Sequence, residues 1–282
     1  MLKIAIPKDS EQELGGGFTF RRNLIKALKS PMFFSGVEVT EIEQADLVLL
    51  CSSSMITRET VVKAKELGKP IVLRVDNVPR NSRNRNTGTS RLKSYSEIAR
   101  AVVFQSIWSK EYLESWLGHR GGVIYNGIDT GIFKPEGAKY DWGSPVYLYS
   151  RFNRDETKRW EEAWYKYQMI HRKYPLSQLK IVGNFSPEQV EYNFDFFNGE
   201  NVEYSGIISD PAEMAKIYRS CSWFLATYYN DCYSNTYQEF IACGGKLYQP
   251  SMTGGTPELL KVGVRSIEQM TKDYIKLFEN IL

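Results

Sequence analysis

Short apolar runs alternate along the chain with longer segments in which apolar residues recur every three or four positions. Runs of the first kind favour buried strands, and segments of the second kind favour amphipathic helices. The predicted strands are Lys3–Pro7, Leu47–Cys51, Ile71–Val75, Val102–Gln105, Val123–Tyr125, Val146–Ser150, Leu179–Val182, Val202–Tyr204, Trp223–Thr227 and Lys246–Tyr248. The predicted helices include Phe20–Lys29, Glu59–Leu67, Lys110–Leu117, Trp160–Tyr174 and Pro211–Ser220. Because strands and helices take turns, the pattern predicts an α/β protein with parallel sheets built from βαβ units.

One segment near the middle of the chain breaks this alternation. Phe133–Ser144 contains two glycines, a proline and several polar residues, which is typical of a linker. We therefore predict two Rossmann-like domains, over residues 1–140 and 141–265, with parallel sheets facing a central cleft. Ser266–Leu282 is predicted to be an amphipathic helix that packs back towards the N-terminal domain. In such folds a ligand binds at the carboxyl ends of the strands.

Composition and charge narrow the class of protein. The 282 residues are 42% hydrophobic and 24% charged, which is typical of a globular chain and not of a disordered one. The formal charge of +3 divides unequally, with a balance of +6 over residues 1–140 and −3 over residues 141–282, which suggests that the two halves bind different ligands. The four cysteines show no paired spacing, so we expect reduced thiols. The sequence has no run of about 18 apolar residues and no secretory signal. We therefore predict a cytoplasmic protein.

A basic segment follows the predicted strand Val146–Ser150 and precedes a predicted helix. Arg151, Arg154 and Lys158 would then lie at the carboxyl end of that strand. Cations placed there can neutralise a diphosphate without a metal ion. A solvated helix start with no ligand is the alternative interpretation of the same cluster.

The segment after the predicted strand Trp223–Thr227 carries two acidic residues around a helix start. Asp231 falls in a polar loop, and Glu239 falls in the first turn or so of the helix that follows. The backbone N–H groups at Ser234, Asn235 and Thr236 could hold an anion beside these acids. The alternative is a capping box, in which Thr236 and Glu239 only satisfy backbone groups of the helix.

The N-terminal half offers a glycine cluster and a basic loop. Gly16 and Gly17 lie before the predicted helix at Phe20, where glycines let backbone N–H groups approach a phosphate. Their spacing is not that of a dinucleotide fingerprint, and an ordinary flexible loop is the alternative. The segment Asn77–Ser96 is interpreted as a basic loop suited to a polyphosphate backbone, or else as a solvated loop. Its cations are Arg80, Arg83, Arg85, Arg91 and Lys93.

Metal and nucleophile chemistry have little support in the sequence. The two histidines, His119 and His171, lie near no other predicted ligand, and no nucleophile-elbow motif occurs. We therefore expect no metal ion and no cofactor.

Taken in order, these motifs resemble those of the retaining, nucleotide-sugar-dependent glycosyltransferases of GT-B fold that carry an E-x7-E motif. Val123–Pro135 is similar to their segment next to the linker, and Asp231 and Glu239 have the E-x7-E spacing. Arg151 and Lys158 resemble the arginine and lysine that follow the first strand of the donor domain. Further matches are Gly16 and Gly17 with the N-domain glycine loop, and Gly254, Gly255 and Glu258 with the loop after the motif.

The resemblance implies a function for each of these positions. A UDP-linked sugar donor would bind the C-terminal half, with Glu239 on the ribose hydroxyls and Asp231 on the sugar. Arg151 or Arg154, together with Lys158, would stabilise the departing diphosphate, and the helix start at Ser234–Thr236 would assist. The N-domain histidine of the family has no evident counterpart, and Asp76 is the substitute predicted here. The first acid is Asp rather than Glu, and the chain is short for the group.

The acceptor is predicted from charge alone. The basic N-terminal half favours DNA bearing hydroxymethylated bases, as in bacteriophage DNA glucosylation, with Asn77–Ser96 on the backbone. The protein would then act in the host cytoplasm. A cell-envelope glycan or lipid-linked acceptor is the second hypothesis. A non-catalytic nucleotide-sugar-binding or DNA-binding protein is the third. Neither the oligomeric state nor the sugar follows from the sequence.

Overall fold

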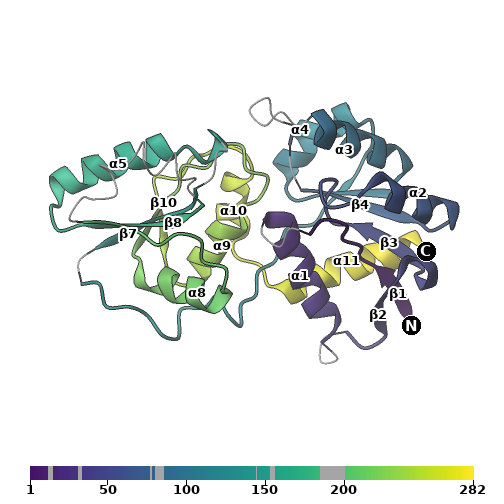
Figure 1. Cartoon of the computed structure of the whole chain (residues 1–282), viewed down its shortest axis with the longest axis horizontal. Coiled ribbons are helices and arrows are strands. Elements are labelled where there is room, and N and C mark those ends of the chain that lie inside the picture. The colour runs from purple at the N-terminus through teal and green to yellow at the C-terminus, as the bar shows by residue number, and fades with distance from the viewer. Residues whose placement is uncertain are drawn as a thin grey trace. The chain divides into compact units, whose positions relative to one another are not determined.

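The computed structural model describes residues 1–11, 15–30, 34–76, 78–79, 86–143, 145–152, 156–184 and 201–282. These residues form two compact units, each built around one parallel sheet (Figure 1). Unit 1 comprises Met1–Asp129 and Leu260–Leu282, and unit 2 comprises Thr130–Leu259. The predicted α/β class with two parallel sheets is confirmed.

The sheet of unit 1 has six strands in the order β2-β1-β3-β4-β5-β6. Its strands β3 and β4 are buried throughout and consist almost wholly of apolar residues, as expected for a parallel sheet covered on both faces. Strand β2 was not predicted, because its alternating sequence at one edge of the sheet has no continuous apolar run. The strands are β1 (Leu2–Ala5), β2 (Val37–Thr40), β3 (Leu47–Leu50), β4 (Ile71–Val75), β5 (Ala101–Phe104) and β6 (Gly122–Val123).

Helices cover both faces of this sheet. Helices α1 (Gly16–Leu28) and α11 (Ile267–Ile281) pack together on one face, where the rings of Phe20 and Tyr274 meet edge to face with centroids 5.5 Å apart. Figure 1 shows α11, in yellow, beside α1, in purple, so the end of the chain lies next to its beginning. The other face carries α2 (Arg58–Glu66), α3 (Asn86–Ile98) and α4 (Ile107–Leu117), and a short 3-10 helix, η1 (Ile42–Gln44), precedes β3.

Helix α3 corrects one prediction. Residues 86–96 were interpreted as the second part of a basic loop, but they belong to this helix. Leu92, Tyr95, Ser96 and Ala99 are all buried, and their spacing is that of one helical face. The positive charge of the segment hid this weak apolar periodicity. Arg91 and Lys93 therefore project from a helix and not from a loop, and both are exposed.

The sheet of unit 2 has five strands in the order β11-β10-β7-β8-β9. The strands are β7 (Val146–Phe152), β8 (Gln178–Gly183), β9 (Val202–Tyr204), β10 (Trp223–Leu225) and β11 (Lys246–Tyr248). The described helices are η3 (Glu156–Lys158), α5 (Trp160–Lys173), α8 (Pro211–Ser220) and α9 (Asn235–Ala242), and α10 (Thr256–Val262) bridges the boundary between the two units. No helix within the described residues is long and apolar enough to cross a membrane.

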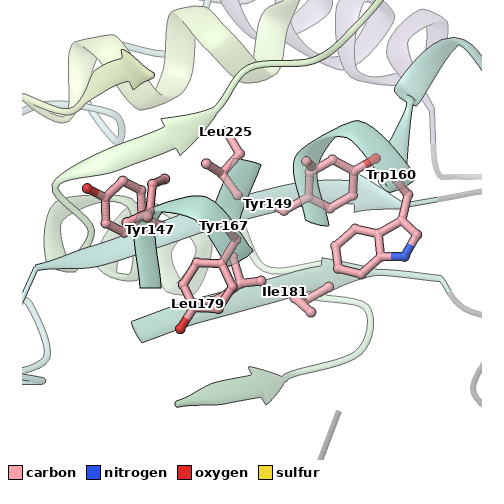
Figure 2. Close-up of a cluster of buried hydrophobic side chains, with 9 residues drawn as sticks. Tyr147, Tyr149, Trp160, Tyr167, Leu179, Ile181 and Leu225 are labelled. Atoms are coloured by element: carbon pink, nitrogen blue, oxygen red, sulfur yellow. The ribbon is translucent and has the colours of Figure 1, made fainter. Parts of the chain in front are cut away.

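Aromatic side chains fill the space between β7 and α5. Tyr147 and Tyr149 leave β7 on the same face, since alternate residues of a strand share a face, and they meet Trp160 and Tyr167 of α5 (Figure 2). The Tyr149 and Trp160 rings lie 5.0 Å apart between centroids. The Tyr167 hydroxyl donates to the Ser177 carbonyl at 2.9 Å, and burial raises the pKa of Tyr167 to about 12. This core fixes the strand that leads into the candidate site.

Candidate functional site

An ion pair lies just beyond the carboxyl ends of β7 and β10. Lys158 ends the short helix η3, and its Nζ lies 2.9 Å from Oδ2 of Asp231, which follows β10. The same ammonium group stands 3.9 Å from the ring centroid of Tyr228, an arrangement that favours a cation. The two side chains are 13% and 22% exposed, so water and ligands can still reach the pair. The sequence placed Lys158 and Asp231 each after a predicted strand but did not predict that they pair. The structure brings them together as an ion pair.

Backbone contacts hold Lys158 in place. Its carbonyl accepts one hydrogen bond from the Tyr149 hydroxyl at 3.0 Å and another from the Thr227 hydroxyl at 2.9 Å. The Thr157 carbonyl accepts a third, from the N–H of Tyr229 at 2.7 Å. Because these partners come from β7 and from the loop after β10, the lysine is fixed relative to both strands before any ligand arrives.

A glycine turn packs against the backbone of Asp231. The N–H of Gly255 donates to the Asp231 carbonyl at 2.8 Å, and the N–H of Asn230 donates to the Thr253 hydroxyl at 3.1 Å. Gly254 has φ +63°, and a Cβ added there would lie 2.4 Å from the Asp231 carbonyl oxygen. Only glycine fits this approach, which explains why the motif after the helix contains adjacent glycines.

The helix after Asp231 begins two residues earlier than a Thr236 cap would require. Ser234 is the N-cap, and its hydroxyl accepts from the N–H of Tyr237 at 3.3 Å. The capping-box interpretation of Thr236 and Glu239 is therefore wrong, because both residues lie inside α9. Glu239 is 6% exposed, and its carboxylate accepts a hydrogen bond from the Tyr218 hydroxyl at 3.4 Å.

The start of α9 is also buried. Ser234 and Asn235 are each 6% exposed and Thr236 is 1% exposed. The first turn of α9 itself holds no acidic side chain that would offset the positive end of the helix dipole. Asp231 and the α9 start thus combine a carboxylate, hydroxyl and amide groups and a helix N-terminus beside Lys158.

A second group of predicted residues lies at the carboxyl end of β4 in unit 1. Gly16 and Gly17 form the first turn of α1 rather than a loop before it. A Cβ added to Gly17 would lie 2.9 Å from Sδ of Met55 and 3.3 Å from Oδ2 of Asp76. The glycine therefore permits the helix start to approach the half-buried Asp76 closely. The structure brings these three predicted residues together.

A buried arginine supports this edge of the sheet, and sequence reasoning missed it. Arg74 is 1% exposed and donates to the Cys51 carbonyl at 2.9 Å and to Oδ1 of Asn126 at 3.0 Å. Its guanidinium group lies 3.9 Å from the ring centroid of Phe20. The sequence feature that could have revealed this role is the arginine inside the apolar run of β4. A charged side chain is rarely buried unless partners bind it.

Comparison with known proteins rests on structure. No protein-family model and no curated protein matches the sequence. HepE from Anabaena, solved in complex with UDP, matches with a TM-score of 0.69 at 13% identity over 99% of this chain and 90% of that one. AviGT4, a glycosyltransferase involved in avilamycin A biosynthesis, matches with a TM-score of 0.60 at 14% identity, covering 96% and 87%. The chain has the GT-B fold.

A third solved structure is also similar over the whole chain. MnaA of S. aureus, solved with UDP, matches with a TM-score of 0.59 at 14% identity over 100% of this chain and 89% of that one. Structural matches at sequence identities this low establish only the fold. The reaction has to be argued from the site. Within the GT-B fold of this chain, the two groups of residues described above follow strand ends of separate units, as ligand sites in parallel sheets do.

Several predicted residues are not part of either group. Arg80, Arg83, Arg85 and Arg154 lie outside the described residues, and Arg151 is described only as part of the backbone of β7. On α3, the Lys93 ammonium lies 6.0 Å from the ring centroid of Trp116, at the surface of unit 1. The predicted diphosphate arginine and most of the predicted DNA-binding cations therefore remain predictions.

Histidine and metal chemistry receive no further support. The ring of His119 lies next to backbone carbonyls, with Nε2 at 3.1 Å from the Ala99 oxygen, and the ring of His171 stacks on Tyr167. Within the described part of the chain, no group of three or more His, Cys, Asp or Glu residues is arranged to hold a metal ion.

Proposed function

We propose that the protein is a glycosyltransferase that moves a sugar from a UDP-linked donor to an acceptor hydroxyl with retention of configuration. The observation that carries this proposal is the fixed Lys158–Asp231 pair beside the buried start of α9, in a chain of GT-B fold. The GT-B protein HepE has been solved with both UDP and UDP-glucose, which supports a nucleotide-sugar donor for this chain.

Each polar group around α9 has a part in donor binding in this proposal. Lys158 stabilises the negative charge that develops on the departing diphosphate, together with Arg151 or Arg154. Asp231 accepts hydrogen bonds from hydroxyls of the sugar, and Glu239 accepts them from the ribose. The N–H groups and side chains of Ser234–Thr236 bind the phosphate oxygens at the positive end of the helix.

Transfer then requires no dedicated base in unit 2. The acceptor oxygen attacks the anomeric carbon from the face that the diphosphate leaves, forming the new glycosidic bond as the old carbon–oxygen bond breaks. The acceptor proton passes to the departing phosphate oxygen, so the charges balance without histidine. Asp76, with Gly16 and Gly17 beside it, is proposed to act where the family has its N-domain histidine.

For the acceptor we propose DNA with hydroxymethylated bases. The supporting observations are the charge balance of +6 over residues 1–140 and the exposed cations Arg91 and Lys93 on α3. A base in duplex DNA would have to flip out of the stack to reach a sugar donor. Because phosphate contacts depend on salt, transfer to DNA should fall steeply as the salt concentration rises.

The test is incubation with a panel of nucleotide sugars, followed by measurement of nucleoside diphosphate release and mass spectrometry of the acceptors. The acceptors are hydroxymethylated DNA, unmodified DNA and glycans, and NMR of the product determines the anomeric configuration. We expect transfer to hydroxymethylated DNA alone, and a loss of about 100-fold or more in the Lys158→Ala variant. Transfer only to glycans would overturn the DNA proposal and leave the enzyme class intact.

A matched control exists on α5. Lys166 pairs with Glu162 at 2.9 Å and is 16% exposed, so Lys166→Ala removes a similar ion pair away from the α9 start. This variant should transfer sugar at the wild-type rate. Epimerisation of a UDP-sugar without any acceptor, or donor binding without turnover, would refute the glycosyltransferase proposal.

A further inference from the structure

A cavity lies at the amino ends of the unit 2 strands, whereas the Lys158–Asp231 pair lies beyond their carboxyl ends. Val146, Trp223 and Lys246 line it, and they are the first residues of β7, β10 and β11. Its volume is about 680 Å³, enough for a ligand of nucleotide size. Since Lys158 and Asp231 follow the last residues of β7 and β10, the cavity is distinct from the proposed donor site.

One wall of the cavity comes from the segment that precedes β7, and aromatic stacking holds it in place. The Tyr140 and Trp142 rings stack with centroids 5.0 Å apart and an interplanar angle of 13°. The ammonium of Lys216 lies 3.8 Å from the Tyr140 centroid, and that of Lys180 lies 4.5 Å from the Trp142 ring. The outer face of each ring thus carries a cation, which fixes both rings in one arrangement.

Hydrogen bonds anchor the same wall to the body of unit 2. The N–H of Tyr140 donates to the Ser220 hydroxyl at 2.7 Å, and the side-chain amide of Gln178 donates to the Trp142 carbonyl at 2.8 Å. The Tyr140 hydroxyl donates to the carboxylate of Glu213. This wall is therefore preformed although it has no regular secondary structure.

The lining of the cavity has an excess of positive charge. Among its described residues, Lys139, Arg219 and Lys246 are cations and Asp141 is an anion. The Arg219 Nε donates to the Ala138 carbonyl at 2.8 Å, so a neutral group is its partner there. In the described part of the chain neither Lys139 nor Lys246 forms an ion pair, and both are exposed.

The remaining lining is aromatic or neutral. Trp223 is half-buried and held edge to face against Tyr248, with centroids 5.9 Å apart. Burial raises the pKa of the Cys221 thiol far above its ordinary value, so this thiol stays neutral and adds no charge. A fixed aromatic surface beside uncompensated cations is the combination that binds a ring with a phosphate attached.

We infer that this cavity binds a phosphorylated ring compound of the nucleotide or sugar phosphate class. Lys139 and Lys246 contact the phosphate, and Trp223 contacts the ring. The inference concerns a second site and does not depend on the proposed glycosyltransferase activity.

The experiment is calorimetric titration of the full chain with UMP and with glucose 1-phosphate, in a Lys158→Ala background that weakens the proposed donor site. Inorganic phosphate and uridine serve as probes that carry only the phosphate or only the ring. We expect UMP or glucose 1-phosphate to bind more tightly than either partial probe. The stronger of the two identifies the ring as a base or a sugar.

The site is assigned with two double variants of equal charge change. Lys139→Ala with Lys246→Ala should weaken binding by about tenfold for each lysine. Lys29→Ala with Lys65→Ala, at exposed positions of unit 1, should leave it within about twofold. Trp223→Leu should weaken binding of the complete ligands and leave that of inorganic phosphate unchanged.

Three results would overturn the inference. The first is that none of the four probes binds. The second is that the two double variants bind UMP or glucose 1-phosphate with equal affinity. The third is that inorganic phosphate binds as tightly as the complete ligands. Because surface lysines are replaced, a thermal melt of each double variant checks that unit 2 stays folded. Nucleoside diphosphate release in the Lys158-intact chain tests the proposed activity separately, so either idea can fail alone.

Discussion

In the proposed donor site, the Asp231 carboxylate would compete with the diphosphate for Lys158. At 2.9 Å it pairs with the Lys158 ammonium and offsets its positive charge. Replacing the carboxylate with an amide removes the negative charge that opposes binding of the phosphate to this cation. We expect Asp231→Asn to bind UDP more tightly, by roughly 0.5–1 kcal/mol for a partly exposed pair.

The same variant should transfer sugar more slowly, because the amide accepts hydrogen bonds from sugar hydroxyls less strongly than a carboxylate does. Calorimetry with UDP and product formation with the complete donor measure the two effects. Weaker UDP binding by Asp231→Asn would show that the carboxylate positions Lys158 rather than masking it.

The glycine beside Asp231 allows a comparison of strain with steric clash. Gly254 and Gly206 have similar backbone angles, φ +63° and +68°, but a Cβ on Gly206 would meet nothing within 4 Å. Both changes to alanine incur left-handed strain of about 1 kcal/mol, and Gly254→Ala adds overpacking of about 2 kcal/mol. Urea denaturation of the two variants should show this difference, and equal losses would mean that the Asp231 backbone yields freely.

Single residues differ in how well the sequence could place them. Lys158 and Asp231 were predictable, because each follows an apolar strand and strand ends meet at one edge of a parallel sheet. Ser234 was not recognised as the cap of α9, because Thr236 and Glu239 fit the capping-box spacing equally well. Arg74 was hidden inside a strand, since its partners Cys51 and Asn126 are distant in sequence and come together only in the folded unit.

Between elements, the packing of α11 on α1 contains a polar atom without a partner. The Tyr274 hydroxyl is buried and forms no hydrogen bond to any described residue. Tyr274→Phe should therefore raise the free energy of unfolding by about 1 kcal/mol, because a buried hydroxyl without a partner destabilises the fold. Urea denaturation measures the change.

The Tyr167 hydroxyl in unit 2 provides the matched control. It donates to the Ser177 carbonyl at 2.9 Å, so Tyr167→Phe should lower the free energy of unfolding by about 1 kcal/mol. Destabilisation by Tyr274→Phe as well would indicate that a water molecule bonds to the Tyr274 hydroxyl.

Most elements were predicted from their apolar pattern, and two with a weak pattern were missed. Ile71–Val75, Val202–Tyr204 and Pro211–Ser220 have the predicted bounds. Strand β2 and helix α3 were missed because their burial depends on neighbours: β2 pairs with β1 along one edge, and α3 packs against α2 and α4. Local sequence carries little of that information.

Across the whole molecule, buried thiols and phenols make the folded state sensitive to alkali. Burial raises the pKa of Cys51 and of Tyr167 to about 12 and that of Cys243 to about 11. In the unfolded chain cysteine and tyrosine ionise near about 8.5 and 10. The unfolded state therefore releases protons first, and stability should be complete below about pH 8.5 and fall as the pH rises towards 12.

Urea denaturation at intervals from pH 8 to pH 11 measures this decline. Tyr167→Phe and Cys51→Ala should each make it shallower, because each removes one group that ionises mainly in the unfolded state. A free energy of unfolding that stays constant over this range would contradict the prediction.

Helix α11 follows unit 2 in the sequence but belongs to unit 1, and this order has a consequence for synthesis. Leu260–Leu282 belong to the same unit as Met1–Asp129, and the Tyr274 and Phe278 side chains of α11 are wholly buried there. During translation all of unit 2 leaves the ribosome before α11 does. Unit 2 can therefore fold while the chain is still growing, whereas residues 1–129, which are made before unit 2, complete their packing only after α11 has been made.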